Sequence, residues 1–184
     1  MIYTSYYKSP IGNILLASKD NQLIGLWFEN QKYYKANNQE EQIENDNDTT
    51  IIKTKNWLDR YFNNEQPNPQ ELKLNPKGTD FQKTIWKFLL EIPYGKVITY
   101  KDLATQFAKI KKRKSMSSQA IGGAVGHNPI SIIIPCHRVV STSGSITGYA
   151  GGIEKKVKLL IHENVDMKKL YIKKKGDLDE QSSR

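Results

Sequence analysis

The sequence predicts a protein of two lobes: an α/β lobe of antiparallel strands plus a helix, followed by a mostly helical lobe that contains a helix-turn-helix. Short β-branched and aromatic runs between turn residues fill the first 28 positions, as is typical of strands. After the proline-containing stretch 63–78, apolar residues instead recur at helical spacing. We therefore expect an amino-terminal domain at 1–78 with its linker from about 63, a second domain at 79–167, and a flexible basic and then acidic tail at 168–184.

The first lobe begins with three strand-like runs, at residues 2–7, 14–18 and 23–28. The segments between them, Ser9-Pro10-Ile11-Gly12 and Asp20-Asn21, are typical turn sequences, so we expect an antiparallel meander. Residues 29–50 are rich in Asn, Gln and Glu without an apolar period, which predicts a loop. The apolar positions at 51–62 then predict a helix.

The second lobe begins with a capping box in which Thr79 is the N-cap and Gln82 lies three residues later. This predicts a helix that ends at Pro93-Tyr94-Gly95 and has these residues on its apolar face: Phe81, Ile85, Phe88, Leu89 and Ile92. Thr99 is the expected cap of a helix from Tyr100 to about Ile110. Ser117 or Ser118 then caps a short helix that reaches about Gly126.

A last helix is expected at about 154–162, with Val157, Leu160 and Ile161 on its apolar face. The two short helices before it, joined by a turn, form a helix-turn-helix pattern. The second of these contains Gly122, Gly123 and Gly126, and each glycine costs roughly 1 kcal/mol relative to alanine inside a helix. Tight packing in the core and close approach by another surface explain these glycines equally well.

The net charge of +9 indicates a polyanionic partner such as nucleic acid. The basic residues form two clusters: Lys109, Lys111, Lys112, Arg113 and Lys114, and then Lys168, Lys169, Lys173, Lys174 and Lys175. The first cluster lies between the two helices of the helix-turn-helix, where it is well placed for phosphate contacts. The second is more simply explained as a solvated surface.

Cys136 is the only cysteine in 184 residues, which excludes an internal disulfide and a multi-cysteine metal site. The apolar β-branched run 132–134 before it predicts a short buried strand that ends at Pro135. His137 and Arg138 follow, and both can favour a thiolate over a thiol. A lone cysteine is often a small buried hydrophobe, but the Pro-Cys-His-Arg turn favours a reactive thiol.

The chain has no run of about 18 apolar residues, so no membrane span is expected. Its first residues lack the basic start and apolar core of a secretory signal. One unpaired cysteine fits a reducing compartment. We expect a cytoplasmic protein, associated with the nucleoid in a prokaryote or located in the nucleus of a eukaryote.

Several motifs, in their joint order, resemble the O6-alkylguanine-DNA alkyltransferases, also called methylated-DNA–protein-cysteine methyltransferases. The resemblance covers Phe81 to Asn164, and the first lobe more loosely. It rests on these motifs: Ile92-Pro93-Tyr94-Gly95-Lys96-Val97, Thr99-Tyr100, Ala120-Ile121-Gly122-Gly123-Ala124, Gly126-His127-Asn128-Pro129, Ile134-Pro135-Cys136-His137-Arg138-Val139, Gly148-Tyr149-Ala150-Gly151-Gly152 and His162-Glu163. It implies a ribonuclease-H-like α/β lobe followed by a helical lobe with the helix-turn-helix.

The resemblance also implies a reaction without a cofactor. Cys136 attacks the alkyl carbon of O6-alkylguanine in duplex DNA and keeps the alkyl group, so each molecule acts once. O4-alkylthymine is a second expected substrate. His137 deprotonates the thiol through a water molecule, and Glu163 orients His137. Tyr100 donates toward the departing guanine, which is a poor leaving group as an anion. The base must flip out of the duplex to reach the thiol.

Further residues are implied to contact the substrate or the DNA. Asn128 supports the turns around the thiol, Tyr149 forms a wall of the pocket, and the backbone near Val139 and Ala150 holds the base edge. Ala120, Gly122 and Gly123 let their helix approach the minor groove closely. Arg138 belongs to the same expected set. Gln119 takes the position at which many relatives carry an arginine that replaces the flipped base.

Some relatives bind zinc near their amino terminus, but here all three histidines lie in the second lobe, so we expect no metal. We expect a monomer. Three alternatives remain open: a non-catalytic protein that recognises alkylated DNA, a helix-turn-helix regulator, and a cysteine hydrolase. Cys136 argues against the first of these, because relatives of that kind lack the cysteine. A regulator is expected to dimerise and to bind a specific sequence.

Overall fold

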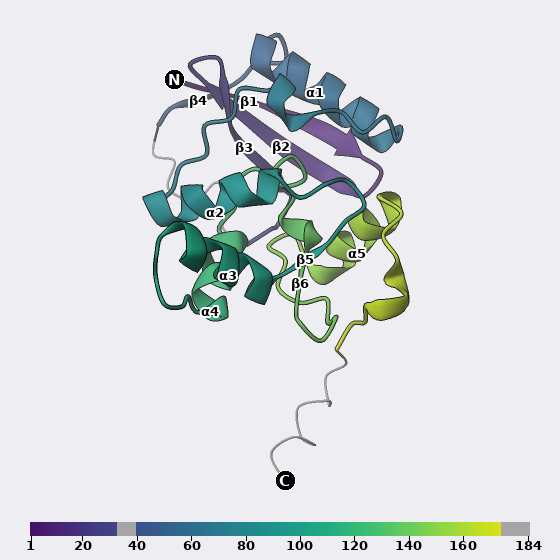
Figure 1. Cartoon of the computed structure of the whole chain (residues 1–184). Helices are drawn as coiled ribbons and strands as arrows, with labels where there is room; N and C mark the ends of the chain where they lie inside the picture. Colours follow the sequence, from purple (N-terminus) through teal and green to yellow (C-terminus); the bar gives the residue numbers. More distant parts are fainter. Residues whose placement is uncertain (33–39, 174–184) are drawn as a thin grey trace.

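The computed structural model describes residues 1–32 and 40–173. Its first lobe is a four-stranded sheet with a helix packed across it (Figure 1). The strands β1 (Ile2–Ser9), β2 (Gly12–Lys19) and β3 (Gln22–Phe28) form the expected antiparallel meander, so that prediction is confirmed. A short strand β4 (Gln42–Glu44) runs parallel to β1, which gives the sheet order β3-β2-β1-β4.

The prediction of a loop at 29–50 is wrong at two places. Strand β4 lies within this segment, and helix α1 (Thr49–Phe62) begins in it, two residues before the expected start. Asp48 caps α1 by accepting hydrogen bonds from Thr50 N and Ile51 N. β4 is largely exposed and has no apolar pattern, so its pairing with β1 rather than its composition makes it a strand. Residues 33–39 of the expected loop lie outside the described residues.

The second lobe contains four α-helices among the described residues: α2 (Asp80–Leu90), α3 (Tyr100–Ile110), α4 (Ser118–Gly126) and α5 (Ile153–His162). The caps predicted at Thr79, Thr99 and Ser117 are confirmed, and each hydroxyl accepts a backbone N–H of the first helical turn. The 3₁₀ helices are η1 (Pro69–Glu71), η2 (Cys136–Arg138) and η3 (Met167–Lys169). Strands β5 (Ile98–Thr99) and β6 (Val139–Val140) pair in parallel.

Backbone hydrogen bonds join the two lobes directly. Leu26 N donates to Pro129 O (2.9 Å), and Ser131 N donates to Leu26 O (3.0 Å). Strand β3 therefore holds the segment that leads to the cysteine. One apolar cluster also runs from the sheet through α1 into the second lobe, where Ile121 and Cys136 belong to it. Figure 1 shows α2, α3 and α4 gathered on the side of the molecule away from α1.

The predicted buried strand before Pro135 is wrong. Residues 131–134 form turns, and Cys136 is the first residue of η2. Ile132 has a φ of 69°, which is unusual for a β-branched residue and incompatible with a strand. The run is apolar because it is buried between the sheet and the helical lobe, and periodicity cannot separate such burial from a strand.

One expectation for α5 needs correction. Ile161 is 56% exposed, whereas Lys156 is 0% exposed and takes the expected apolar face together with Leu159 and Leu160. The flexibility of the tail from residue 168 stays a prediction; in its first part, Tyr171 N donates to Gly144 O (3.1 Å) and Tyr171 O accepts from Ile146 N (2.8 Å). Residues 174–184 of that tail lie outside the described residues. Within the described parts, no helix has the length and apolar character needed to cross a bilayer.

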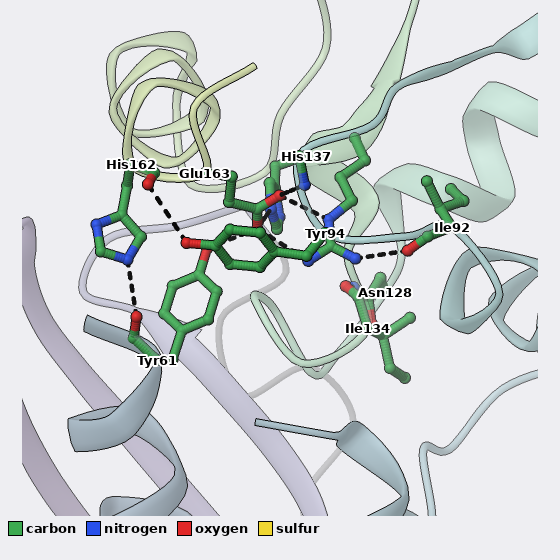
Figure 2. A network of polar contacts seen from close by, with 10 residues as sticks. Tyr61, Ile92, Tyr94, Asn128, Ile134, His137, His162 and Glu163 are labelled. Atoms are coloured by element: carbon green, nitrogen blue, oxygen red, sulfur yellow. Dashed lines mark hydrogen bonds and ion pairs between the residues drawn. The ribbon is translucent and has the colours of Figure 1, made fainter. Parts of the chain in front are cut away.

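A buried carboxylate connects the elements of both lobes (Figure 2). Glu163, at the end of α5, is 2% exposed. Its Oε1 accepts from Tyr61 on α1 (2.7 Å), and Arg138 donates to both of its oxygens (2.8 and 2.9 Å). Arg138 also donates to Ile92 O (2.6 Å), after α2. A single side chain therefore holds α1, the segment after α2, and η2 together.

Gly95 supplies a backbone contact to the same carboxylate. Its N–H donates to Glu163 Oε2 at 3.3 Å. Its φ is +73°, and a Cβ built here lies 2.8 Å from Glu163 O, so only glycine fits this approach without movement of the backbone. The Pro93-Tyr94-Gly95 turn thus ends α2 and also covers Glu163.

Replacing Glu163 tests how much the fold depends on this carboxylate. Burial raises the pKa of Glu163, but His137 and Arg138 together hold it well below its ordinary value. The stabilisation is therefore present above pH about 4.3 and declines as the pH falls from there toward the folded-state pKa. Glu163→Gln is expected to lower the free energy of unfolding at pH 7 by about 3–5 kcal/mol, because Arg138 stays buried without its counter-charge.

The measurement is urea unfolding between pH 7 and pH 3, with the surface substitution Glu91→Gln as the control. The difference between wild type and Glu163→Gln should shrink as the pH falls through the acidic range. An equal loss of stability in both variants, or a difference independent of pH, would contradict the role given to Glu163.

Candidate active site

The Cys136 thiol lies at the start of η2, and Asn128 holds the turn in front of it. Asn128 Nδ2 lies 2.8 Å from Ile134 O, 3.3 Å from Ile130 O and 3.2 Å from Cys136 Sγ. Asn128 Oδ1 accepts from Ile130 N at 3.0 Å. One amide thus fixes the strained turn and contacts the sulfur, which agrees with the supporting position expected for Asn128.

The environment of Cys136 contains opposing influences on its pKa. The side chain is 4% exposed, and burial raises the pKa of the thiol. The Asn128 hydrogen bond, the charge of Lys156 and the backbone N–H groups of Cys136 and His137 all lower it, but burial prevails. The resting group is therefore a thiol, which must lose its proton before it can act as a nucleophile.

His137 follows Cys136 in η2, and its ring contacts Glu163. Its Nε2 lies 2.6 Å from Glu163 Oε1, and the ring is 0% exposed. Burial holds the pKa of His137 below its ordinary value against the raising effect of Glu163, so the ring is neutral at pH 7. Because an ionised carboxylate only accepts, the ring proton of neutral His137 sits on Nε2. Nδ1, which has no hydrogen-bond partner among the described residues, is then a free base.

Arg138 is engaged inside the protein. Its guanidinium is bound to Glu163 and to Ile92 O, its side chain is 9% exposed, and it lies 5.7 Å from the Tyr94 ring centre. The expected contact of Arg138 with substrate or DNA stays a prediction. The charge of Arg138 balances Glu163, so Arg138 is not the group that favours a thiolate.

Lys156 is a site residue that the sequence did not reveal. It is 0% exposed, and Nζ donates to Val139 O (2.5 Å) and Thr147 O (2.9 Å). Its Nζ also lies 5.9 Å from the centre of the Tyr100 ring. Lys156 precedes Leu159 and Leu160 by three and four residues, which places it on the buried face of α5. This spacing is the one sequence feature that indicates its burial. Tyr61 is a second residue of this kind: the sequence predicts it only as an apolar position of a helix, but its hydroxyl donates to Glu163.

A groove of about 600 Å³ lies between α3, α4 and the loop 141–150. Tyr100, Tyr149 and Ala150 line it together with residues of α4. Tyr100 OH donates to Thr147 O at 3.4 Å, and burial, followed by the nearby Cys136, raises the pKa of Tyr100 to about 12. Tyr100 is therefore a protonated donor at neutral pH that faces the groove.

The surroundings of the α4 glycines decide between tight packing in the core and close approach by another surface. A Cβ built at Gly123 or Gly126 meets nothing within 4 Å, and one at Gly122 touches only the Tyr100 ring at 3.9 Å. Packing inside the protein therefore requires none of these glycines, which favours close approach by an external surface. The opposite face of α4 is anchored by Trp86, whose Nε1 donates to Ala124 O (2.9 Å).

Of the remaining predicted residues, Gln119 lines the same groove. Gln119 and Ala120 are exposed in the first turn of α4, and their backbone N–H groups donate to the hydroxyl of the cap Ser117. Ala150 O accepts from Lys32 N (2.9 Å), and Val139 is 0% exposed, with its carbonyl bound to Lys156. The basic loop that joins α3 to α4, taken together with the last turn of α3, is exposed at all five of its cationic positions: Lys109, Lys111, Lys112, Arg113 and Lys114. Among the described residues, no group of three or more His, Cys, Asp or Glu could hold a metal ion.

Comparison with known proteins gives matches over both lobes. Residues 2–76 match the family described as 6-O-methylguanine DNA methyltransferase, ribonuclease-like domain. Residues 80–165 match the family described as 6-O-methylguanine DNA methyltransferase, DNA binding domain. The expected fold class, a ribonuclease-like lobe followed by a helical lobe, is thereby confirmed.

Individual relatives agree with these matches. A methylated-DNA–protein-cysteine methyltransferase of Haemophilus influenzae is 39% identical over 164 residues, 89% of this chain and 87% of the relative. One of the same name from Methanosarcina barkeri is 37% identical and covers 89% of this chain and 98% of the relative. The crystal structure of Mycobacterium tuberculosis OGT in complex with DNA superposes with a TM-score of 0.73 at 36% identity, over 88% of this chain and 91% of that one. Together with the geometry of the cysteine site, these similarities show that the chain belongs to the 6-O-methylguanine DNA methyltransferase family.

Proposed function

We propose that this protein repairs DNA by moving the methyl group of O6-methylguanine onto Cys136, once per molecule. The observation that carries the proposal is the buried pairing of His137 with Glu163, which leaves Nδ1 as a free base on the residue that directly follows the only cysteine of the chain. The names of the relatives support the same reaction. O4-alkylthymine presents a similar alkyl–oxygen bond and is a second substrate of the same type.

The reaction begins with the thiol proton, which passes through a water molecule to Nδ1 of His137. Glu163 then faces an imidazolium, whose charge it stabilises across the 2.6 Å contact. The thiolate attacks the methyl carbon, a new S–C bond forms, and the C–O bond breaks with its electron pair left on guanine. Tyr100 gives its phenolic proton to that anion. The methyl group comes from the DNA itself, so the reaction needs no cofactor. The S–C bond of the thioether is not hydrolysed by water, so the protein stays methylated and the reaction ends after one transfer.

The arrangement also accounts for access to a base inside a duplex. The alkylated guanine must rotate out of the stack before it can reach a thiol that is 4% exposed. Ala120, Gly122 and Gly123 then allow α4 to lie in the minor groove, and Gln119 occupies the space that the base leaves. Tyr149 and the backbone near Val139 and Ala150 receive the flipped base. The basic loop supplies phosphate contacts without sequence preference.

A protein of this kind works alone on chromosomal DNA. We infer that it binds duplex DNA as a monomer, in the cytoplasm of a prokaryote or in the nucleus of a eukaryote. The net charge of +9 suits this partner. A monomer is sufficient because Cys136, His137, Glu163 and Tyr100 all come from one chain.

Intact-mass measurement tests the transfer. After incubation with duplex DNA that contains O6-methylguanine, each wild-type chain is expected to gain the mass of one methyl group. Cys136→Ser should gain nothing, because a hydroxyl in this site is far less acidic and less nucleophilic than a thiol. An unchanged mass of the wild-type protein, or a modified Cys136→Ser protein, would overturn the proposal.

Two substitutions at Gly123 test whether DNA approaches the open side of α4. Gly123→Ala is expected to raise the free energy of unfolding by about 1 kcal/mol and to bind duplex DNA nearly as wild type does. Gly123→Leu should remain at least as stable as wild type, yet bind duplex DNA at least tenfold more weakly, because its side chain fills the space of the approaching groove. Fluorescence anisotropy and urea unfolding provide the two readouts. Normal DNA binding by a folded Gly123→Leu would place the DNA elsewhere.

Gln119 sets how long the base stays flipped. Glutamine can fill the vacated space and form hydrogen bonds, but it lacks the charge and reach of arginine. Gln119→Arg is therefore expected to tighten binding to duplex DNA or to speed methyl transfer several-fold, as measured by anisotropy and by the rate of mass gain. Lys83→Arg, on α2, serves as the control for a guanidinium placed elsewhere. If Gln119→Arg leaves both quantities unchanged, the role given to Gln119 is wrong.

A further inference from the structure

Of the three buried charges in the site, two balance each other and the third has no counter-ion in the described part of the chain. Glu163 and Arg138 form one pair, and His137 is neutral beside them. Lys156 is the remaining buried cation. Its two acceptors are carbonyl oxygens, and no ion pair joins its ammonium to a carboxylate of the described residues. A buried ammonium without an anion is unfavourable, so an anion formed nearby would be stabilised strongly.

Two groups near Lys156 become anionic during the proposed reaction. Cys136 and Lys156 influence each other electrostatically in both directions: the cation lowers the pKa of the thiol, and the sulfur raises the pKa of the amine. Tyr100 shares an acceptor with Lys156, because Tyr100 OH and Lys156 Nζ both donate to Thr147 O (3.4 and 2.9 Å). Lys156 Nζ also lies 5.9 Å from the Tyr100 ring centre.

We propose that Lys156 is the counter-ion of the Cys136 thiolate and, after the transfer, of the Tyr100 phenolate. The inference rests on the proposed methyl transfer for its second half only. In the first step the thiol proton leaves and the thiolate faces the Lys156 ammonium. In the second, the sulfur becomes a neutral thioether, guanine takes the Tyr100 proton, and the phenolate that remains faces the same ammonium. Lys156 is therefore a positioning residue for charge, and it does not touch the methyl group.

The other buried titratable groups near the thiol do not offer this positive charge. His137 is buried and neutral in the resting state, and the charge of Lys156 itself helps to lower its pKa. Arg138 is bound to Glu163. Tyr149 is a phenol whose pKa is raised well above its ordinary value by burial. Burial also lowers the pKa of Lys156 to about 8, so the amine is mostly protonated at neutral pH.

Thiol alkylation without DNA tests the first half, independently of any repair activity. The rate of Cys136 alkylation by iodoacetamide is followed by mass between pH 5 and pH 10. Lys156→Gln keeps a hydrogen-bond donor but removes the charge, and it is expected to move the midpoint of the profile upward by about one pH unit, a tenfold loss of thiolate at neutral pH. Lys158→Gln, the same change on the exposed face of α5, should leave the midpoint in place. Lys156→Arg keeps the positive charge and should return the midpoint most of the way to its wild-type value.

Wild-type protein provides a second measurement that does not depend on the folding of a variant. Cys136 becomes anionic as the pH rises through its pKa, and alkylation with iodoacetamide puts a neutral thioether in place of that anion. The pKa of Lys156, followed by NMR of the labelled lysine side chain, is therefore expected to be lower in the alkylated protein than in the unmodified one. An unmoved midpoint in folded Lys156→Gln, or an unmoved Lys156 resonance on alkylation, would overturn the assignment.

Methyl transfer tests the phenolate. At a pH where the thiol is ionised in both proteins, Lys156→Gln should still transfer several-fold more slowly than wild type, and this difference should vanish in a Tyr100→Phe background. If wild type and Lys156→Gln transfer the methyl group at equal rates while Tyr100 is intact, Lys156 is not the counter-ion of the phenolate. Absence of transfer in wild type would instead count against the proposed function and leave the thiol titration unaffected.

Discussion

The Glu163 carboxylate is the constraint on which the rest of the molecule depends. An ionised group that is 2% exposed needs several donors, and here they come from Tyr61, Arg138, His137 and Gly95. These donors belong to three segments of the chain: α1, η2 and the turn that follows α2. Satisfying one buried charge therefore fixes α1 against α5, orients η2, and sets the tautomer of the histidine beside the thiol. The stability of the fold and the tautomer of His137 therefore depend on the same carboxylate.

Most of the ionisable groups in the site are neutral in the resting protein. Burial favours a neutral thiol, a neutral imidazole and a neutral phenol in the resting protein. Only Glu163, Arg138 and Lys156 are charged there, and the first two neutralise each other. The resting site is thus slow to react with small molecules in water. A bound DNA that excludes solvent would make each remaining charge interaction stronger.

Features with local causes could be predicted from the sequence. The meander and the three capped helix starts follow from turn residues, hydroxyl caps and apolar spacing. Features with long-range causes could not. β4 exists because β1 offers it an edge, and the run before Pro135 looks like a strand because two lobes bury it. Arg138 and Lys156 both appear as surface cations in the sequence, and only the fold shows that each has a buried partner or neighbour.

The attachment of the pre-cysteine segment to strand β3 has a consequence for how the chain acquires its reactivity. Leu26 meets Pro129 and Ser131 across about a hundred residues of sequence, and such distant contacts form late in folding because the loop between them must first close. Until then, Asn128, His137, Glu163 and Lys156 have no fixed relation to the sulfur. A nascent or partly folded chain therefore carries an ordinary cysteine, and the specialised nucleophile appears only when the last long-range contacts are complete.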